Sequence, residues 1–250
     1  MKRNYQENYS NISNEMYEVN SRKIKANKTI KVLQDYLNST VNLNLLDIGS
    51  STGIMTNEYS KHFKTVTAID IDSKAIQYAK ETFKTRNITF INSPIEEANF
   101  QPESFDVITC SHIYEHVPSS KILMEHIYNL LKPGGVCYFA AGNKFQIIEP
   151  HYKLPFLSYL PKKAADQYIK IFTNQEEYYE THYSLKNLKK LTSKFKIIDY
   201  TLEIIKSPSK YSSTEMLKEN TLKYIIINLL SKFLYPIIPT YIWVLEKPIK

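Results

Sequence analysis

The stretch Asn44-Leu45-Leu46-Asp47-Ile48-Gly49-Ser50-Ser51-Thr52-Gly53 decides how this chain of 250 residues folds. Its first half is an apolar run typical of a buried strand, and its second half is a turn of small residues. The five glycines of the chain stand only at positions 49 and 53, 134 and 135, and 142. Glycine suits places where the backbone bends or is approached closely. A strand followed by such a turn and a helix is how a parallel sheet meets a nucleotide-type cofactor.

Strand and helix patterns alternate from this stretch onward, which predicts a parallel sheet with crossover helices. Strands are expected at 44–48, 66–70, 88–92, 105–110 and 135–141, and helices near 53–62, 73–85 and 119–131. The run Lys132-Pro133-Gly134-Gly135 ends the third of these helices and turns the chain into the fifth strand. The predicted fold class is α/β, a doubly wound Rossmann-like sheet.

One domain with four segments is expected over residues 1–250. Residues 1–42 form a helical cap with an amphipathic stretch at 24–37, residues 43–142 the cofactor-binding core, residues 143–183 a substrate-side insertion, and residues 184–250 the rest of the sheet. The last segment predicts a helix at 184–195, a strand at 196–205, a helix at about 213–234 and a strand at 241–245. Its apolar part is interrupted by Lys232, Pro236 and Pro239. It is therefore expected to be a core helix and a buried strand, with peripheral membrane contact through 222–235 as the alternative.

Composition restricts the partners and the compartment. The net charge is +7, and its excess lies outside residues 43–145, but the basic residues are nearly all lysines. Recognition of phosphate tends to use arginine, so nucleic acid is not the expected partner. Cys110 and Cys137 lie in apolar strand-like runs, which favours small core residues in a reducing cytoplasm over a disulfide. The polar start of the chain, residues 1–10, shows no secretory signal, so a cytoplasmic location is expected.

The spacing of the first turn distinguishes two cofactor classes. A dinucleotide fingerprint requires glycine at its first, third and sixth positions. Counted from Gly49, the third position is Ser51 and the sixth is Ile54, so the turn does not match the motif that binds NAD. The pattern Asp47-x-Gly49-x-Ser51-x-Gly53 instead resembles the first motif of class I S-adenosylmethionine-dependent methyltransferases, with serine in the middle glycine position.

Further motifs follow in the order that this family requires. Asp70 closes the second expected strand, and Ser93-Pro94-Ile95-Glu96 follows the third. The exit of the fourth strand, Ser111-His112-Ile113-Tyr114-Glu115-His116-Val117, and the later Leu131-Lys132-Pro133-Gly134-Gly135 resemble the branch that includes the quinone-biosynthesis O-methyltransferases. The resemblance covers residues 43–142.

The resemblance implies S-adenosyl-L-methionine as the cofactor and a seven-stranded sheet of order 3-2-1-4-5-7-6 whose last strand is antiparallel. It implies that Asp70 accepts the ribose hydroxyls, that Ile71 lies against the adenine, and that N–H groups of the turn bind the cofactor's carboxylate. The cofactor-binding residues carried over in this way are Asp47, Gly49, Ser50, Ser51, Gly53, Asp70, Ile71, Ser93, Pro94, Ile95 and Ser111.

Catalytic residues are sought in the insertion and at the exit of the fourth strand. His151 is the leading candidate for a general base because a loop histidine there would lie near the sulfonium, with His182 and Tyr152 behind it, and His116 is the second catalytic candidate. In similar quinone enzymes a glutamate stands at the position of His112, in an acidic set that binds a divalent cation. Histidine disfavours magnesium there, so no metal site is predicted.

The predicted function is methyl transfer to a small-molecule, sugar or lipid-linked acceptor, by O-methylation. Two alternatives remain open. One is a quinone-like C- or O-methyltransferase at a membrane surface, and the other is a non-catalytic module that binds S-adenosylmethionine. The oligomeric state is not predicted.

Overall fold

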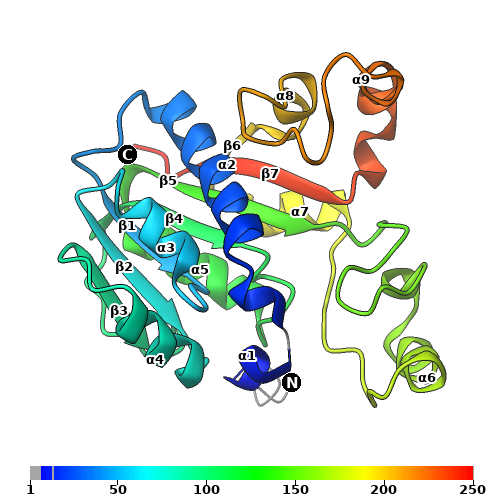
Figure 1. Cartoon of the computed structure of the whole chain (residues 1–250), viewed down its shortest axis with the longest axis horizontal. Coiled ribbons are helices and arrows are strands. Elements are labelled where there is room, and N and C mark those ends of the chain that lie inside the picture. Colours follow the sequence, from blue (N-terminus) through cyan, green and yellow to red (C-terminus); the bar gives the residue numbers. More distant parts are fainter. Residues whose placement is uncertain (1–6, 13, 250) are drawn as a thin grey trace.

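A computed structural model describes residues 7–12 and 14–249 of the chain. Within this part, seven strands form one sheet of order β3-β2-β1-β4-β5-β7-β6 (Figure 1). The helical cap expected over residues 1–42 lies partly outside the described residues, at positions 1–6 and 13. The strands are β1 (Asn44–Ile48), β2 (Thr65–Asp70), β3 (Ile88–Asn92), β4 (Phe105–Ser111), β5 (Leu131–Gly142), β6 (Lys196–Asp199) and β7 (Thr240–Glu246).

Pairing of the strands confirms the predicted fold class and strand order. Strands β1 to β5 are parallel to one another, whereas β7 runs antiparallel to its neighbours β5 and β6. Because the carboxyl ends of β1, β2 and β4 meet at one edge, Gly49, Asp70 and Ser111 emerge together. The C-terminal strands β6 and β7 belong to the same sheet as β1 to β5.

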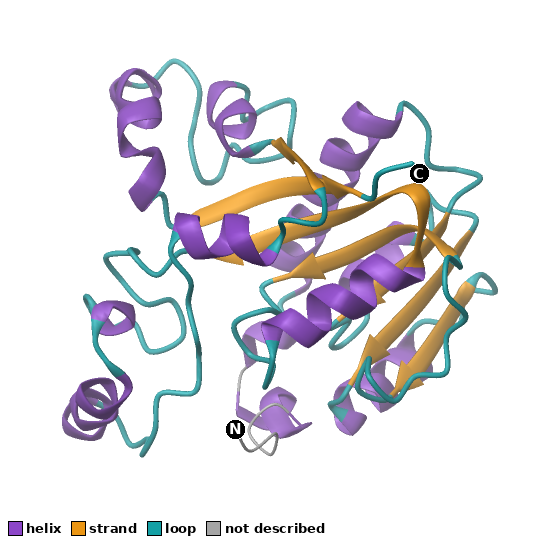
Figure 2. Cartoon of the chain, turned by 180° about the vertical axis from the view of Figure 1, so that it is seen from behind, coloured by secondary structure: helices purple, strands orange, loops and turns teal. Residues whose placement is uncertain are grey.

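Helices cover both faces of the sheet. The described part begins with α1 (Tyr9–Ile12), a 3-10 turn η2 (Asn14–Tyr17) and the long α2 (Val19–Leu37). Helix α2 crosses one face beside α3 (Ile54–Tyr59), and α4 (Ser73–Thr82) lies on the same face (Figure 1). Helices α5 (Ser120–Leu130) and α7 (Leu185–Leu191) cover the other face, which is seen in Figure 2.

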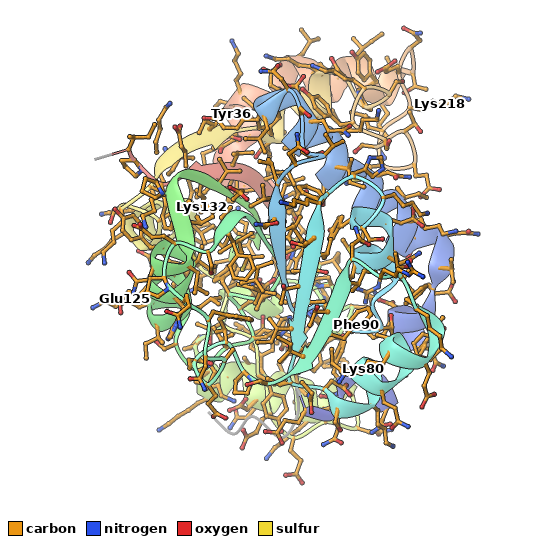
Figure 3. The ribbon with its side chains drawn as sticks, turned by 90° about the vertical axis from the view of Figure 1, so that its left-hand side faces the viewer. Tyr36, Lys80, Phe90, Glu125, Lys132 and Lys218 are labelled. Carbon is orange, nitrogen blue, oxygen red and sulfur yellow. The ribbon has the colours of Figure 1, made fainter. Side chains whose placement is uncertain are left out.

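Two buried clusters fill the spaces between these layers. Leu46, Ile108 and Phe139 pack against α5 and α7, whereas Leu45, Val107 and Val244 pack against α2 and α3. Figure 3 shows the side chains on both faces, with Phe90 of β3 beside α4. Cys110 and Cys137 are fully buried in the first cluster as free thiols, as the sequence predicts.

The segment after β6 departs from the sequence prediction. The strand expected at 196–205 ends at Asp199, whose carboxylate accepts a hydrogen bond from the Thr201 N–H and turns the chain into helix α8 (Thr201–Lys206). The helix expected from residue 213 begins only at Leu222, as α9 (Leu222–Leu234), where the Thr221 side chain caps it. A 3-10 turn, η4 (Tyr235–Ile237), then leads into β7.

Helix α9 is not the core helix that its apolar sequence suggests. Its polar side faces the protein: the Tyr224 hydroxyl donates to the carbonyl of Lys206, and the Asn228 amide donates to that of Ile205. The apolar side faces outward, because these hydrogen bonds to α8 hold the opposite, polar side of α9 against the protein. Exposed on or just after the helix are Leu222, Ile225, Ile226, Leu229, Leu230, Phe233 and Ile237. Among the described residues, no helix has both the length and the apolar character needed to span a membrane.

Residues 143–183 form a substructure of their own at the edge where the parallel strands end. It contains the 3-10 turn η3 (Leu157–Tyr159) and helix α6 (Lys162–Phe172), neither of which the sequence analysis identified. A small apolar cluster of Leu157, Ala165, Ile169 and Tyr178 holds it together. Its two ends meet, because Asn143 bridges to Tyr183 directly after β5.

Candidate active site

The turn after β1 is held in an uncommon backbone shape. Gly49, Ser51 and Gly53 have φ values of 75°, 52° and 74°. A Cβ at Gly49 would overlap with Ile113 Cδ1, and one at Gly53 would lie 2.8 Å from Ala79 Cβ. The N–H groups of Gly49 and Ser50 donate to the carbonyl of Ile69, which pins the turn to β2. Glycine is therefore required twice here, once for a close approach from the loop after β4 and once for contact with α4.

Asp70, the last residue of β2, is fixed against this turn. Its two carboxylate oxygens accept hydrogen bonds from the N–H groups of Ser51 at 2.7 Å and Asp72 at 2.9 Å. Desolvation outweighs these two bonds and raises the pKa of Asp70 to about 6. A buried carboxylate of this kind is poised to accept hydroxyl donors from a ligand.

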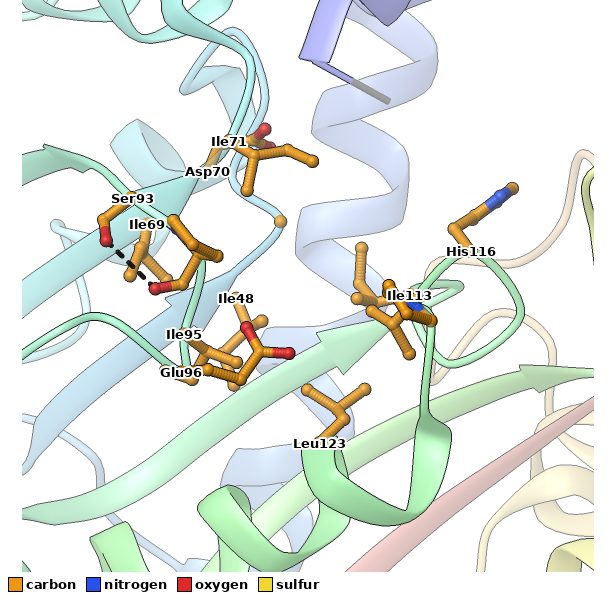
Figure 4. Close-up of a pocket in the computed structure, with 14 residues that line it drawn as sticks. Ile48, Ile69, Asp70, Ile71, Ser93, Ile95, Glu96, Ile113, His116 and Leu123 are labelled. Atoms are coloured by element: carbon orange, nitrogen blue, oxygen red, sulfur yellow. Dashed lines mark hydrogen bonds between the residues drawn. The ribbon is translucent and has the colours of Figure 1, made fainter. Parts of the chain in front are cut away.

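A cavity of about 110 Å³ opens between the ends of β1, β2 and β4. Figure 4 shows Asp70 and Ile71 above the cavity in this view, His116 to the right of it, and Ile95 and Leu123 below it. The residues that the sequence analysis placed at the site and that line this cavity are Gly49, Asp70, Ile71, Ser93, Pro94, Ile95 and His116.

Other residues of the predicted set take different positions. Asp47 is buried, and its two oxygens accept hydrogen bonds from the hydroxyls of Thr56 at 2.6 Å and Thr109 at 2.7 Å, so it fastens α3 and β4 to β1. Gly53 underlies α3, and Ser111 ends β4. None of these, nor Ser50, Ser51 or His151, lines the cavity. Direct contact of these residues with a cofactor stays a prediction.

The cavity fits an adenosyl cofactor in two respects. An apolar slot of Ile71, Pro94 and Ile95 adjoins the Asp70 carboxylate, which is the combination that a purine and its ribose require. The hydroxyls of Ser50 and Ser51 are buried without a hydrogen-bond partner among the described residues. Since buried polar groups are seldom left unpaired, these hydroxyls are available to a polar ligand group at the turn.

The loop after β4 presents a buried carboxylate. His112 takes a left-handed conformation at φ 56°, and its Nδ1 lies 3.1 Å from Glu115 Oε1. Glu115 has no exposed surface, and its carbonyl accepts a hydrogen bond from the Thr181 N–H of the insertion. Burial alone would raise the pKa of Glu115, but the bond to His112 and the nearby histidine charges lower it to about 2. The loop is therefore locked to the insertion.

The insertion supplies a second buried carboxylate, Glu149. One of its oxygens accepts the N–H groups of His151 and Tyr152, both at 2.8 Å. The other lies 2.8 Å from Nδ1 of His151 and 3.4 Å from Nε2 of His182. Burial opposes ionisation of Glu149, but these bonds lower its pKa to about 2, and the same carboxylate helps to raise the pKa of His151 against the effect of burial.

Glu180 is the third buried carboxylate, and the sequence analysis missed it. It is 4% exposed, and neither of its oxygens has a hydrogen-bond partner among the described residues. His116 Nδ1 lies 3.7 Å from Glu180 Oε1, and desolvation lowers the pKa of His116 to about 4 while it raises that of Glu180. A repeated Glu-x-His pattern, Glu149-x-His151 and Glu180-x-His182, was the available signal.

His116 and His151, the two predicted catalytic residues, lie together. Their rings are perpendicular, with centroids 4.9 Å apart. His116 also lines the cavity, so it joins the predicted cofactor site to the histidine–glutamate cluster of the insertion. We call Glu115, His116, Glu149, His151, Glu180 and His182 the Glu/His cluster.

Several known proteins similar to this chain are methyltransferases. Residues 46–139 match a family described as "Methyltransferase domain". A ubiquinone biosynthesis O-methyltransferase of Coxiella burnetii (strain Dugway 5J108-111) is 31% identical over 102 residues, which cover 40% of this chain and 44% of that protein. The aligned part of the chain thus spans less than half the length of this curated relative.

Solved structures extend the likeness to most of the chain. An S-adenosylmethionine-dependent methyltransferase from Mesorhizobium loti has a TM-score of 0.56 at 15% identity, covering 86% of this chain and 95% of that one. Phosphoethanolamine N-methyltransferase 2 of Haemonchus contortus, solved with phosphomonomethylethanolamine and S-adenosylhomocysteine, has a TM-score of 0.54 at 19% identity, covering 89% of this chain and 53% of that one. At these identities the likeness shows the fold. Residues 46–139 thus match a methyltransferase domain, and the chain shares its fold with class I S-adenosylmethionine-dependent methyltransferases.

Proposed function

We propose that this protein transfers the methyl group of S-adenosylmethionine to an oxygen atom of a small-molecule, sugar or lipid-linked acceptor. The observation that carries the proposal is the position of His116, which lines the cavity and at the same time contacts Glu180 and His151 of the Glu/His cluster. An acceptor bound over the cavity would meet polar side chains on this one side, with apolar residues around the rest.

The chain's own residues would divide the work. Asp70 holds the ribose hydroxyls, and the slot beside Ile95 holds the adenine. When bound, the cofactor supplies an activated methyl group, whose bond to sulfur breaks as a bond to the acceptor oxygen forms, leaving S-adenosylhomocysteine. Alignment and exclusion of water are the main tasks left to the protein.

We assign to His116 and His151 the contact with the acceptor oxygen, which must lose its proton during methylation. His151 Nδ1 is engaged by Glu149, so Nε2 is the ring nitrogen left to face an acceptor. The insertion that carries His151 is anchored to the loop after β4 through Thr181 and Glu115, which fixes the distance between the two histidines.

Methyl transfer from isotopically labelled S-adenosylmethionine tests this proposal. The acceptors to supply are catechol and quinol compounds, free sugars, and a total lipid extract. We expect labelled product with the wild-type chain, none with Asp70→Ala, and a strongly reduced rate with His151→Ala. His126→Ala, which changes a histidine on α5 outside the cluster, should keep the full rate. Cofactor binding without transfer to any acceptor class would favour the non-catalytic binding module.

A lipid-linked acceptor at a membrane surface is supported by helix α9. Its outward face carries Leu229 and Phe233 at 77% and 83% exposure, and Lys223 and Lys232 flank that face. Such an arrangement suits the interface of a bilayer with anionic lipids. Flotation with anionic vesicles should recover the wild-type chain, whereas Leu229→Glu with Phe233→Glu should stay unbound and remain folded. Equal recovery of both proteins would remove this candidate.

A further inference from the structure

Histidine and glutamate side chains far apart in the sequence converge beside the cofactor cavity. His116 comes from the loop after β4, whereas Glu149 with His151 and Glu180 with His182 come from the two ends of the insertion. The convergence depends on the closed path of the insertion, whose first and last residues meet at the end of β5. These groups therefore form a built site at the rim of the cavity.

The carboxylates of the Glu/His cluster are buried and lack a permanently charged partner among the described residues. Glu115, Glu149 and Glu180 are 0%, 0% and 4% exposed. Within the described part of the chain, their ion pairs are all with histidines, and no lysine or arginine joins them. Burying a carboxylate away from water is costly unless it is paired or coordinates a metal. A bound cation would supply the positive charge that these carboxylates lack.

Glu180 points to the position of that cation. Both of its oxygens are buried without a hydrogen-bond partner in the described residues, although His116 and His151 provide nitrogen atoms close by. One donor atom from each of these three residues lies within 4.8 Å of the others. The overlapping group of Glu149, His151 and His182 is less suitable, because Glu149 already accepts two backbone N–H groups and contacts both histidines.

We propose that His116, His151 and Glu180 bind a divalent transition-metal ion such as Zn²⁺ or Mn²⁺. Two imidazoles and one carboxylate favour such ions over Mg²⁺, which prefers an all-oxygen shell with several waters. Glu149 is then the outer carboxylate that holds Nδ1 of His151 and directs Nε2 to the metal, a pairing common at histidine-ligated metals. Three protein ligands leave coordination positions open.

The open positions give the ion a role in the reaction, and this step rests on the proposed function. His116 lines the cofactor cavity, so an ion bound to it faces the acceptor side. An acceptor hydroxyl bound to the ion would lose its proton to solvent water more easily, because the positive charge stabilises the alkoxide or phenolate that takes the methyl group. In this arrangement the ion activates the acceptor oxygen, and His151 acts as a ligand instead of as a free base.

Metal binding can be tested without any acceptor. The purified full chain is stripped with a chelator, dialysed, and titrated with ZnCl₂ and with MnCl₂ in a calorimeter, and Co²⁺ is added to record the visible absorption of a protein-bound ion. We expect one equivalent of metal and a Co²⁺ spectrum. Glu180→Gln and His151→Ala should each weaken binding at least about tenfold, whereas Glu149→Gln should weaken it by about 10- to 100-fold through loss of orientation.

His126→Ala is the matched control and should bind metal like the wild type. Glu180→Gln keeps the shape of the side chain, and its circular dichroism spectrum will show that it is folded. Failure of the folded wild type to bind either ion would overturn the metal site. So would metal affinities in Glu180→Gln and His151→Ala that equal the wild-type affinity. Undiminished methyl transfer by metal-free protein would overturn the role of the ion in the reaction and leave the proposed function standing. If the folded wild-type chain did not bind S-adenosylhomocysteine, that result would instead count against the proposed function.

Discussion

Binding of S-adenosylhomocysteine should depend on pH through Asp70. Burial raises the pKa of this carboxylate from 3.8 to about 6, and the proposed ribose contact requires its ionised form as acceptor. The ionised fraction falls from about nine-tenths at pH 7 to about one-tenth at pH 5. We therefore expect the affinity to fall about tenfold between these two pH values, in proportion to the fraction competent to bind. Isothermal titration calorimetry across pH 5 to 8 measures it directly.

The same raised pKa makes a prediction about the free protein. The folded state binds a proton at Asp70 more tightly than the unfolded state between pH 3.8 and about 6, so this group's contribution to stability falls as pH rises through that window. A difference of about two pKa units corresponds to at most about 3 kcal/mol at pH 7. Asp70→Asn removes the charge but keeps only one acceptor oxygen. We expect it to raise the free energy of unfolding in urea by about 1 kcal/mol at pH 7.

Asp70→Asn should at the same time bind S-adenosylhomocysteine weakly at every pH. Asp106→Asn is the control, because that aspartate also accepts a backbone N–H and pairs with Lys132 but lies away from the cavity. It should keep the pH-dependent binding. Wild-type affinity that is equal at pH 5 and pH 7, or full affinity in Asp70→Asn, would refute the assignment of Asp70 to the ribose. A loss of stability in free Asp70→Asn would refute the burial argument.

Three further substitutions probe the cofactor turn, each by urea unfolding. Gly53→Ala should destabilise the fold by about 2 kcal/mol or more, because φ is 74° and the new Cβ would lie 2.8 Å from Ala79 Cβ; an unchanged midpoint would contradict this. Ser51→Gly should stabilise it by up to about 1 kcal/mol, since glycine accepts φ 52° and the unpaired hydroxyl is removed, and a clear loss would show that the hydroxyl has a partner. Thr109→Val should cost about 1 to 3 kcal/mol by leaving one Asp47 oxygen without its donor, and a neutral result would mean that water replaces it.

Sequence patterns predicted the place of the cavity at the ends of the parallel strands. Alternating strand and helix signals predicted β1 to β5, and the acid and small residues that follow β1 and β2 predicted where the cavity lies. This works because the carboxyl ends of parallel strands share one edge, so that Gly49 and Asp70 become neighbours once the strands are recognised. Gly49 and Gly53 also signal their backbone shape directly, as their positive φ values show.

Local patterns failed where a long-range contact decides the structure. The apolar residues of α9 predict burial, but hydrogen bonds from Tyr224 and Asn228 to α8 turn that face outward. The strand expected to run through residue 205 stops for a local reason instead: the carboxylate of Asp199 accepts a hydrogen bond from the N–H of Thr201, where helix α8 begins. Periodicity reports which residues share a face, and only the partner element decides which face is covered.

The sequence by itself determined where the first five strands lie, the glycine turn and the carboxylate that ends β2, since each is recognised from residues close together in the chain. Only the tertiary structure brought Glu180 to His116 and Glu149 to His182, because the insertion closes on its own apolar cluster around Leu157 and returns to the end of β5. Contacts between distant segments depend on how a whole loop packs, and no spacing within either segment encodes them.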